Sequence, residues 1–135
     1  MTKRSTNNSN SIEERISRIR QLLYRYRKEQ EGLIWELACP SSMVIGTFYR
    51  VYKTCGKPNC CCKKGKRHGP FPALYSSIGG KRKLKMVRRE DVAEVEQKAK
   101  AYKRYQGNLR IIRQFNREID KLLKEIRGYY LEEYE

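Results

Sequence analysis

The chain has 135 residues and a net charge of +16, because 31 lysine and arginine residues outnumber 15 acidic residues. Its length suits one domain, and 39% apolar residues are enough for a modest core. The longest apolar runs are far too short to cross a bilayer and the polar N-terminus predicts no targeting segment, so we expect a soluble, cytoplasmic protein without membrane contact.

The positive charge is concentrated in the middle of the chain. Residues 1–36 contain eight basic and five acidic residues, and residues 90–135 contain ten of each. Residues 37–89 contain thirteen basic residues and no acidic residue. The cations of such a segment repel one another. An excess of this kind is typical of a surface that binds a polyanion.

The N-terminal third predicts one helix. Residues 1–10 are rich in serine and asparagine and are expected to be a disordered leader. The sequence SIEE, beginning at Ser11, is a capping box, which predicts a helix over residues 11–39 that ends before Pro40. Its apolar residues follow steps of three and four, which predicts one buried seam: Ile12, Ile16, Ile19, Leu23, Tyr26, Leu33 and Leu37, with Gln30 filling one position.

Residues 43–89 predict a basic β-module of three antiparallel strands. The first strand is expected at 46–54, and a hairpin over 73–87 turns at Gly79-Gly80. This turn pairs Tyr75 with Leu84 and Ala73 with Met86 on an apolar face, which we expect to pack on the helices. The opposite face is a lysine ladder that is left to water or an anion, with Ile78 facing Lys81, Ser76 facing Lys83 and Leu74 facing Lys85.

A second long helix is predicted over residues 90–131, with apolar residues again at three- and four-residue steps. The fold class is therefore α+β: a small three-stranded antiparallel β-module with a zinc loop, flanked by two long helices that form an antiparallel coiled-coil-like stalk. The longer helix has apolar surface left over, which favours a homodimer through it. Whether the stalk closes within one chain or between chains stays open.

Four cysteines and the only histidine lie in one short loop of the basic β-module. Cys55, Cys60, Cys62 and His68 form the pattern C-x4-C-x-C-x5-H, whose ligand types and short spacing suit a structural Zn²⁺ with four protein ligands. Neighbouring residues of an extended loop point apart, so we expect Cys61 to face away. The alternative is a reduced loop without metal. Cys39 is expected to be a small buried side chain.

The stretch YRVYKTCGKPNCCCKKGKRHGPFPALYSSIGGKRKLKMV, followed by a charged helix, resembles a family of small bacterial and archaeal proteins of unknown function. That family has a Cys-Gly-Lys-x-x-Cys-x-Cys…His-Gly-Pro-aromatic signature, followed by a tyrosine-rich hairpin and a helix. The resemblance covers about residues 46–105 and implies Cys55, Cys60, Cys62 and His68 as the recurring set. Cys61 stands where a basic or polar residue is more usual. The resemblance implies no activity.

These features favour a zinc-stabilised nucleic-acid-binding protein, with duplex DNA favoured over RNA because a two-stranded ribbon fits a major groove. Tyr49, Tyr52, Phe71 and Tyr75 could stack on unpaired bases, but alternating aromatic residues more often form core. Residues 37–89 contain no carboxylate for acid–base or metal catalysis, so we expect no enzyme. The alternative is a coiled-coil adaptor that binds a protein partner through its helices. The candidate phosphate contacts are Arg50, Lys53, Lys63, Lys64, Lys66, Arg67, Lys81, Lys83, Lys85, Arg88 and Arg89.

Overall fold

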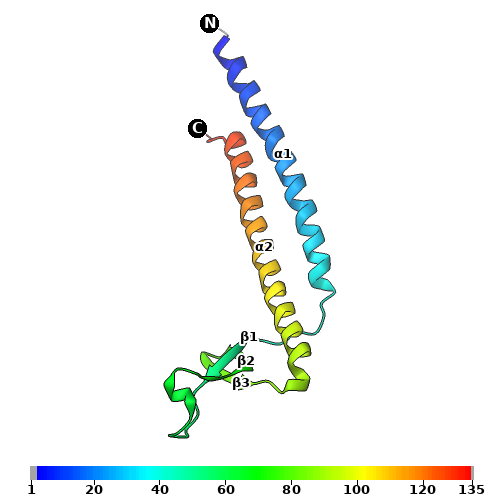
Figure 1. The fold of residues 1–135 in the computed structure, drawn as a ribbon. Coiled ribbons are helices and arrows are strands. Elements are labelled where there is room, and N and C mark those ends of the chain that lie inside the picture. Colours follow the sequence, from blue (N-terminus) through cyan, green and yellow to red (C-terminus); the bar gives the residue numbers. More distant parts are fainter. Residues whose placement is uncertain (1–2, 135) are drawn as a thin grey trace. The chain divides into compact units, whose positions relative to one another are not determined.

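The computed structural model describes the backbone of residues 3–134 and the side chains of residues 10–62 and 64–134. It contains two long helices and one three-stranded antiparallel sheet (Figure 1), which confirms the α+β prediction. Two units are formed: a helical unit, made of the chain up to Pro40 and from Gly107 onward, and a β-unit, Ser41–Gln106. The elements are α1 (Lys3–Ala38), β1 (Thr47–Lys53), the 3-10 turn η1 (Cys61–Lys64), β2 (His68–Ile78), β3 (Lys81–Met86), the 3-10 turn η2 (Arg89–Asp91) and α2 (Val92–Tyr130).

The first helix is longer than the capping box predicted. It begins at Lys3 rather than at Ser11, so most of the expected leader, residues 1–10, continues the helix, while Met1 and Thr2 lie outside the described residues. Starting a helix is unfavourable, but adding a residue to an existing helix costs only its small intrinsic propensity. Serine and asparagine upstream of a strongly amphipathic segment are therefore compatible with helix. The C-terminal end at Ala38 lies one residue before the predicted end.

The predicted apolar seam of α1 is the face that is covered. All eight of its positions are buried or half-buried, and Ile16 and Ile19 are fully buried. Arg15 forms an ion pair with Glu125 at 2.8 Å, whereas the Gln30 side-chain amide donates a hydrogen bond to the Ile112 carbonyl at 3.5 Å. Residue numbers rise along α1 as they fall along α2, so the two helices run antiparallel in the helical unit (Figure 1). A regular coiled-coil geometry stays a prediction.

The hairpin register is the predicted one. Gly79 and Gly80 both have positive φ angles, 60° and 78°, and form the two-residue turn. Each predicted pair is present: Ile78 with Lys81, Ser76 with Lys83, Leu74 with Lys85, Tyr75 with Leu84, and Ala73 with Met86. β1 pairs with the other edge of β2, which places Phe48 opposite Leu74 and Tyr49 opposite Ala73.

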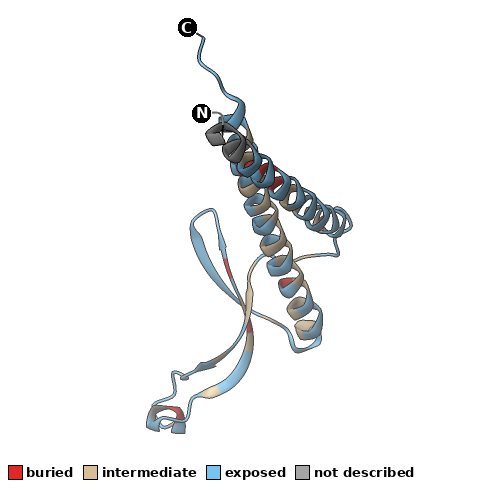
Figure 2. Cartoon of the chain, turned by 90° about the horizontal axis from the view of Figure 1, so that it is seen from above, coloured by how far each residue is buried: buried red, intermediate tan, exposed pale blue. Residues whose placement is uncertain are grey.

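The prediction that the apolar hairpin face packs on the helices is wrong. Ala73 is completely buried, but Tyr75, Leu84 and Met86 remain 36%, 46% and 48% exposed. In Figure 2 most of the sheet is drawn as half-buried or exposed. The first turns of α2 instead approach the other face, where Arg50, Pro72, Val87, Arg89 and Val92 surround one hollow of about 670 Å³.

The helix packs on the opposite face because of β1, a strand that lies outside the hairpin and so does not enter its pairing pattern. β1 places Phe48 next to Leu74, so the lysine-bearing face also contains an apolar pair. A small cavity of about 110 Å³ is lined by Phe48 together with Ala99 and Lys103 of α2. After β3, the backbone N–H of Val87 donates a hydrogen bond to the Pro72 carbonyl, and the chain then enters η2 and α2. The helix therefore returns on the face of Phe48 and Pro72.

Candidate metal centre and basic surface

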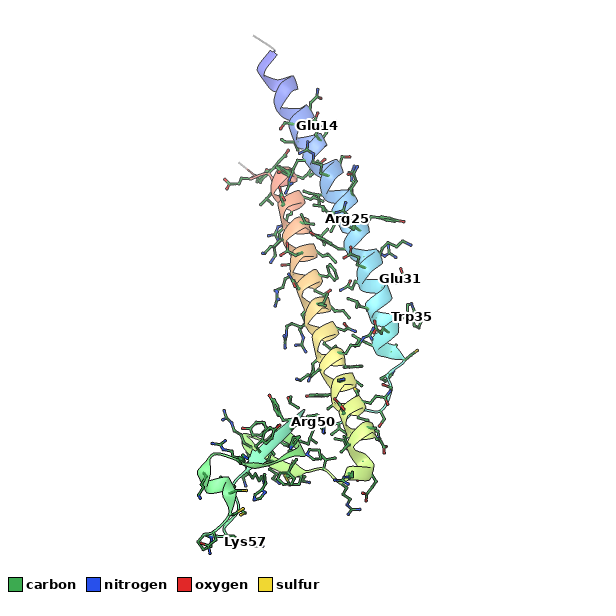
Figure 3. All side chains as sticks on the ribbon, viewed as in Figure 1. Glu14, Arg25, Glu31, Trp35, Arg50 and Lys57 are labelled. Atoms are coloured by element: carbon green, nitrogen blue, oxygen red, sulfur yellow. The ribbon has the colours of Figure 1, made fainter. Side chains whose placement is uncertain are left out.

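The structure brings together the four residues of the predicted metal site. The ligand atoms of Cys55, Cys60, Cys62 and His68 all lie within 4.8 Å of one another. The Sγ atoms of Cys55 and Cys62 are 3.5 Å apart, and the Cys60 Sγ lies 3.0 Å from the His68 Nε2. All five cysteines are free thiols, so no disulfide competes for these sulfur atoms. In Figure 3 sulfur atoms are drawn in yellow beside the loop that contains the labelled Lys57.

Local turns bring the three sulfur atoms together. The backbone N–H of Cys60 donates a hydrogen bond to the Lys57 carbonyl at 3.3 Å, which closes a four-residue turn with Pro58 in the position that proline favours. Cys60 then precedes η1, and Gly65 ends it with a left-handed φ of 101° that favours glycine. Cys61 is therefore in a 3-10 turn rather than in an extended loop. It is still exposed, as predicted, whereas Cys62 is buried.

The β1–β2 pairing supplies the fourth ligand. His68 is the first residue of β2 and pairs with Lys53, two residues before Cys55. Next to it, Gly69 has a φ of 134°, and a Cβ atom there would stand 2.7 Å from the Val51 carbonyl oxygen. Only glycine allows this close approach of the two strands. The strand register thus holds the imidazole beside the cysteine turn.

Hydrogen bonding within the cluster makes its thiols unequal. The pKa of Cys60 is lowered to about 6, because the backbone N–H of Cys62 and the thiols of Cys55 and Cys62 donate hydrogen bonds to its sulfur. For Cys55, a backbone hydrogen bond from Lys57 lowers the pKa, but the thiols of Cys60 and Cys62 together with burial outweigh it and raise the pKa. Cys60 therefore reaches the thiolate form that metals bind at a lower pH than Cys55 does.

The donor set and its spacing fit a tetrahedral metal ion. Bonds of roughly 2.3 Å to sulfur and 2.0 Å to nitrogen at tetrahedral angles imply S···S and S···N edges of about 3.8 Å and 3.5 Å. The observed 3.5 Å and 3.0 Å are slightly shorter, as expected for side chains that close on one another. Because all four ligand atoms lie within 4.8 Å of one another, Cys55, Cys60, Cys62 and His68 could hold a metal ion after small movements.

The predicted phosphate contacts are spread over the β-unit. All six residues of β3 are exposed, including Lys81, Lys83 and Lys85. Among the side chains that the structure describes, no cation between residues 41 and 89 forms an ion pair, whereas α1 and α2 contain several. The side chain of Lys63 lies outside the described residues. The remaining candidates, all exposed, are Arg50, Lys53, Lys64, Lys66, Arg67, Arg88 and Arg89.

Two expectations for single residues need correction. Cys39, expected to be buried, is exposed beyond the end of α1 and does not belong to the metal cluster. The four strand aromatic residues, interpreted mainly as core, are instead exposed: Tyr49 by 51%, Tyr52 by 56%, Phe71 by 38% and Tyr75 by 36%. Alternation along a strand shows which residues share a face, but it does not show whether another element covers that face.

Within the described part of the chain, neither helix contains a segment apolar enough to span a membrane. No curated protein matches the chain at a significant level. No solved structure matches it significantly either. The model of one protein family, described as a domain of unknown function (DUF6788), matches residues 9–97, which include most of α1, the whole sheet and the cysteine cluster. On this match, the chain belongs to the DUF6788 family, whose function is unknown.

Proposed function

We propose that this chain is a nucleic-acid-binding protein without catalytic activity, which contacts phosphates through the basic β-module, residues 43–89. The observation that carries the proposal is the absence of compensating charge. Thirteen basic residues lie between residues 37 and 89 without one acidic residue, and the described ones form no ion pairs. Cations that are not neutralised within the chain favour an external polyanion, whose binding releases condensed counterions.

The helices provide an internal comparison for this argument. Lys98, Lys121 and Lys124 of α2 each form an ion pair with a carboxylate three or four residues away. By contrast, Lys81, Lys83 and Lys85 extend from an edge strand whose residues are all exposed. Lysines on the two elements therefore differ in their electrostatic surroundings. A duplex groove suits the two-stranded ribbon of β2 and β3, so duplex DNA stays the favoured probe for the lysine ladder.

The proposed metal is a structural Zn²⁺ bound by Cys55, Cys60, Cys62 and His68. Three soft sulfur ligands and one imidazole favour zinc over magnesium or calcium, which prefer oxygen ligands. Four protein ligands leave no open position for a substrate. The lysines of the loop would offset the negative charge of three thiolates. In this proposal the metal ties η1 to the start of β2 and so stabilises the strands that carry the lysines.

The decisive experiment measures binding as a function of salt. Fluorescence anisotropy with labelled duplex DNA, single-stranded DNA and structured RNA is recorded between about 50 and 300 mM salt. We expect affinity to fall steeply with salt. If all three lysines contact duplex phosphates, Lys81→Ala/Lys83→Ala/Lys85→Ala reduces the log–log slope by about 2.7, because each contact contributes roughly 0.9.

The matched control removes the same charge from the ion-paired lysines of α2. The triple variant Lys98→Ala/Lys121→Ala/Lys124→Ala should retain most of the binding. Equal losses in both triple variants would show a response to net charge alone. No binding of any probe by folded, metal-loaded protein would refute the proposed function.

A second candidate function is a helical adaptor that binds another protein. The observation in its favour is that Tyr24 and Trp35 are both 66% exposed on α1. They are eleven residues apart, about three helical turns, and so share one side of the helix. Figure 3 shows Trp35 on the outer side of α1. A photo-crosslinking residue in place of Trp35 would be expected to capture one defined protein in cells, with a crosslinker at exposed Glu31 as the control.

The homodimer through α2 is a further proposal. Ile111 and Leu123 of α2 remain about half exposed in the single chain and offer apolar surface. Sedimentation equilibrium of the full chain tests it directly. A mass of two chains that falls to one chain in Ile111→Asp/Leu123→Asp would support dimerisation through this helix, whereas a monomeric wild-type protein would exclude it.

A further inference from the structure

One face of the sheet presents aromatic rings to solvent. The register places Tyr49 of β1, Phe71 and Tyr75 of β2, and Leu84 and Met86 of β3 on the same face. Their exposed fractions range from 36% to 51%. Ala73 lies at the centre of this face, paired with Tyr49 on one side and Met86 on the other, and it is completely buried. We call this face the aromatic platform.

The platform resembles a base-stacking surface in its dimensions. Phe71 and Tyr75 are four residues apart on one strand, which corresponds to about 13 Å. Tyr49 stands on the neighbouring strand, opposite the residue midway between them. The small side chain of Ala73 leaves a low centre between larger side chains. Sheets that bind RNA use a few exposed aromatic side chains in this way to stack two or three bases.

The positive charge of the basic β-module indicates which kind of ligand covers the aromatic platform. An exposed apolar sheet face could be covered by a protein, by a second copy or by nucleic acid. Here the face belongs to a segment with thirteen cations and no carboxylate, and Arg82 shares the face with the rings. Lys81, Lys83 and Lys85 lie on the same edge strand, β3, but on its opposite face. Aromatic rings bordered by cations suit a ligand with apolar flat groups and regularly spaced negative charges.

We propose that the aromatic platform binds single-stranded nucleic acid by stacking unpaired bases on Tyr49, Phe71 and Tyr75. This inference rests on the proposed function and adds single strands, bound on the aromatic platform, to the duplex that suits the lysine ladder. In a duplex, neighbouring base pairs cover the base faces, so the rings find no stacking partner there. In a single strand the base faces are free, and the phosphates can follow the β3 edge, where Arg82 and the three lysines lie. The two faces of the sheet thus have different roles. Bases stack on the aromatic platform, whereas phosphates lie along the β3 edge and on the opposite, lysine-bearing face.

The test compares substitutions that keep the apolar cover but remove the ring. Tyr49→Leu and Tyr75→Leu retain the cover over Ala73, while Tyr49→Phe and Tyr75→Phe retain the aromatic face as matched controls. The probes are a fluorescein-labelled 12-nucleotide single-stranded RNA, the corresponding single-stranded DNA, and a 12-base-pair DNA duplex. Circular dichroism and metal content establish that each variant is folded.

Each leucine variant should bind the single-stranded probes roughly 5- to 150-fold more weakly, which corresponds to the 1–3 kcal/mol that one base–aromatic stack contributes. Duplex binding and the salt slope should not change, because no phosphate contact is removed. The phenylalanine variants should bind like the wild type. A larger effect with the RNA or the DNA probe identifies the sugar that the site prefers.

Several results would overturn the proposal, and they separate it from the proposed function. If the β3 lysine variant loses nucleic-acid binding while the leucine variants bind single strands normally, the proposed function stands and the platform does not. If no probe binds the wild type, both fail. If the leucine variants change the sedimentation mass instead, a second copy covers the platform.

A measurement on the wild-type protein covers the case in which the leucine variants do not fold. A single-stranded DNA probe with one 2-aminopurine base changes its fluorescence when that base changes its stacking partner. We expect a saturable change on titration with wild-type protein, and no change in the corresponding duplex. An unchanged 2-aminopurine signal at saturating protein would overturn the platform as a base-binding site.

Discussion

Two adjacent cysteines, Cys61 and Cys62, are expected to differ in whether they bind the metal. Cys62 is buried, its Sγ lies 3.5 Å from the Cys55 Sγ, and it accepts a hydrogen bond from the Cys55 backbone N–H at 3.3 Å. Cys61 is exposed and is not part of the cluster. Cys62→Ser should therefore lose the metal, whereas Cys61→Ser should keep it, although both variants lose one thiol.

The size of the effect follows from the number of ligands. Structural zinc in small cysteine–histidine sites binds with roughly 10–16 kcal/mol of apparent free energy. If four ligands share this evenly, each contributes about 2.5–4 kcal/mol, which corresponds to roughly 10²- to 10³-fold in affinity. A further loss is expected from the half-buried hydrogen bond that the Cys55 backbone N–H donates to the Cys62 Sγ. Cys62→Ser should thus bind zinc at least about 100-fold more weakly than Cys61→Ser.

Competition against a chromophoric zinc chelator measures both affinities in reduced protein. Metal analysis of the purified wild type should find one zinc per chain. If Cys61→Ser loses the metal and Cys62→Ser keeps it, the ligand assignment is wrong. If reduced wild-type protein binds no zinc at all, the cluster is a reduced loop without metal.

Three other predictions concern the two units and their stability. Removal of zinc by a chelator should unfold the β-unit but leave most of the helical circular-dichroism signal, because the helical unit contains no ligand; simultaneous loss of both signals would contradict this. Gly69→Ala should destabilise the β-unit by roughly 1–3 kcal/mol in chemical denaturation, because it forces a side chain into a glycine-only conformation against Val51, whereas Gly56→Ala, which meets no atom within 4 Å, should change little. In the ion pair of the helical unit, hydrogen bonds from Arg15 and, to a lesser extent, from Tyr129 lower the pKa of Glu125 below its ordinary value of 4.5. The ion pair therefore stabilises the fold above pH 4.5, and this stabilisation is lost as the pH falls below 4.5. Glu125→Gln should therefore melt at a lower temperature than wild type near neutral pH, and this difference should shrink as the pH falls below 4.5. A difference that is constant with pH would show that the ion pair is not responsible.

Much of the secondary structure could be predicted because its signals are local. The spacing of Ile16 and Ile19 predicts one buried helix face, and both side chains are fully buried. The Gly79-Gly80 pair predicts a two-residue turn, and this turn alone determines which hairpin residues stand opposite each other. In the cysteine loop, the spacing of ligand types predicted the four residues that the structure brings together.

Most of the errors have one physical origin, which is that coverage of a surface depends on distant parts of the chain. The exception is Ser11: the prediction that it is the N-cap is wrong, because helix propagation extends α1 upstream to Lys3. For the hairpin, alternation correctly grouped Tyr75 with Leu84, but it could not include β1, which adds Phe48 to the other face.

The amino-acid order alone was thus sufficient for the two helices apart from the start of α1, for the turn and hairpin register, and for the choice of the four residues that could hold a metal ion. The position of His68 beside the cysteines and the exposure of the aromatic platform required the folded chain. Strand pairing brings Lys53 and His68 together at the two ends of the cysteine-containing loop. The return of α2 on the Phe48 face leaves Tyr49 and Tyr75 uncovered. Both are long-range packing events, in which the gain from burying one face determines which other face stays in water.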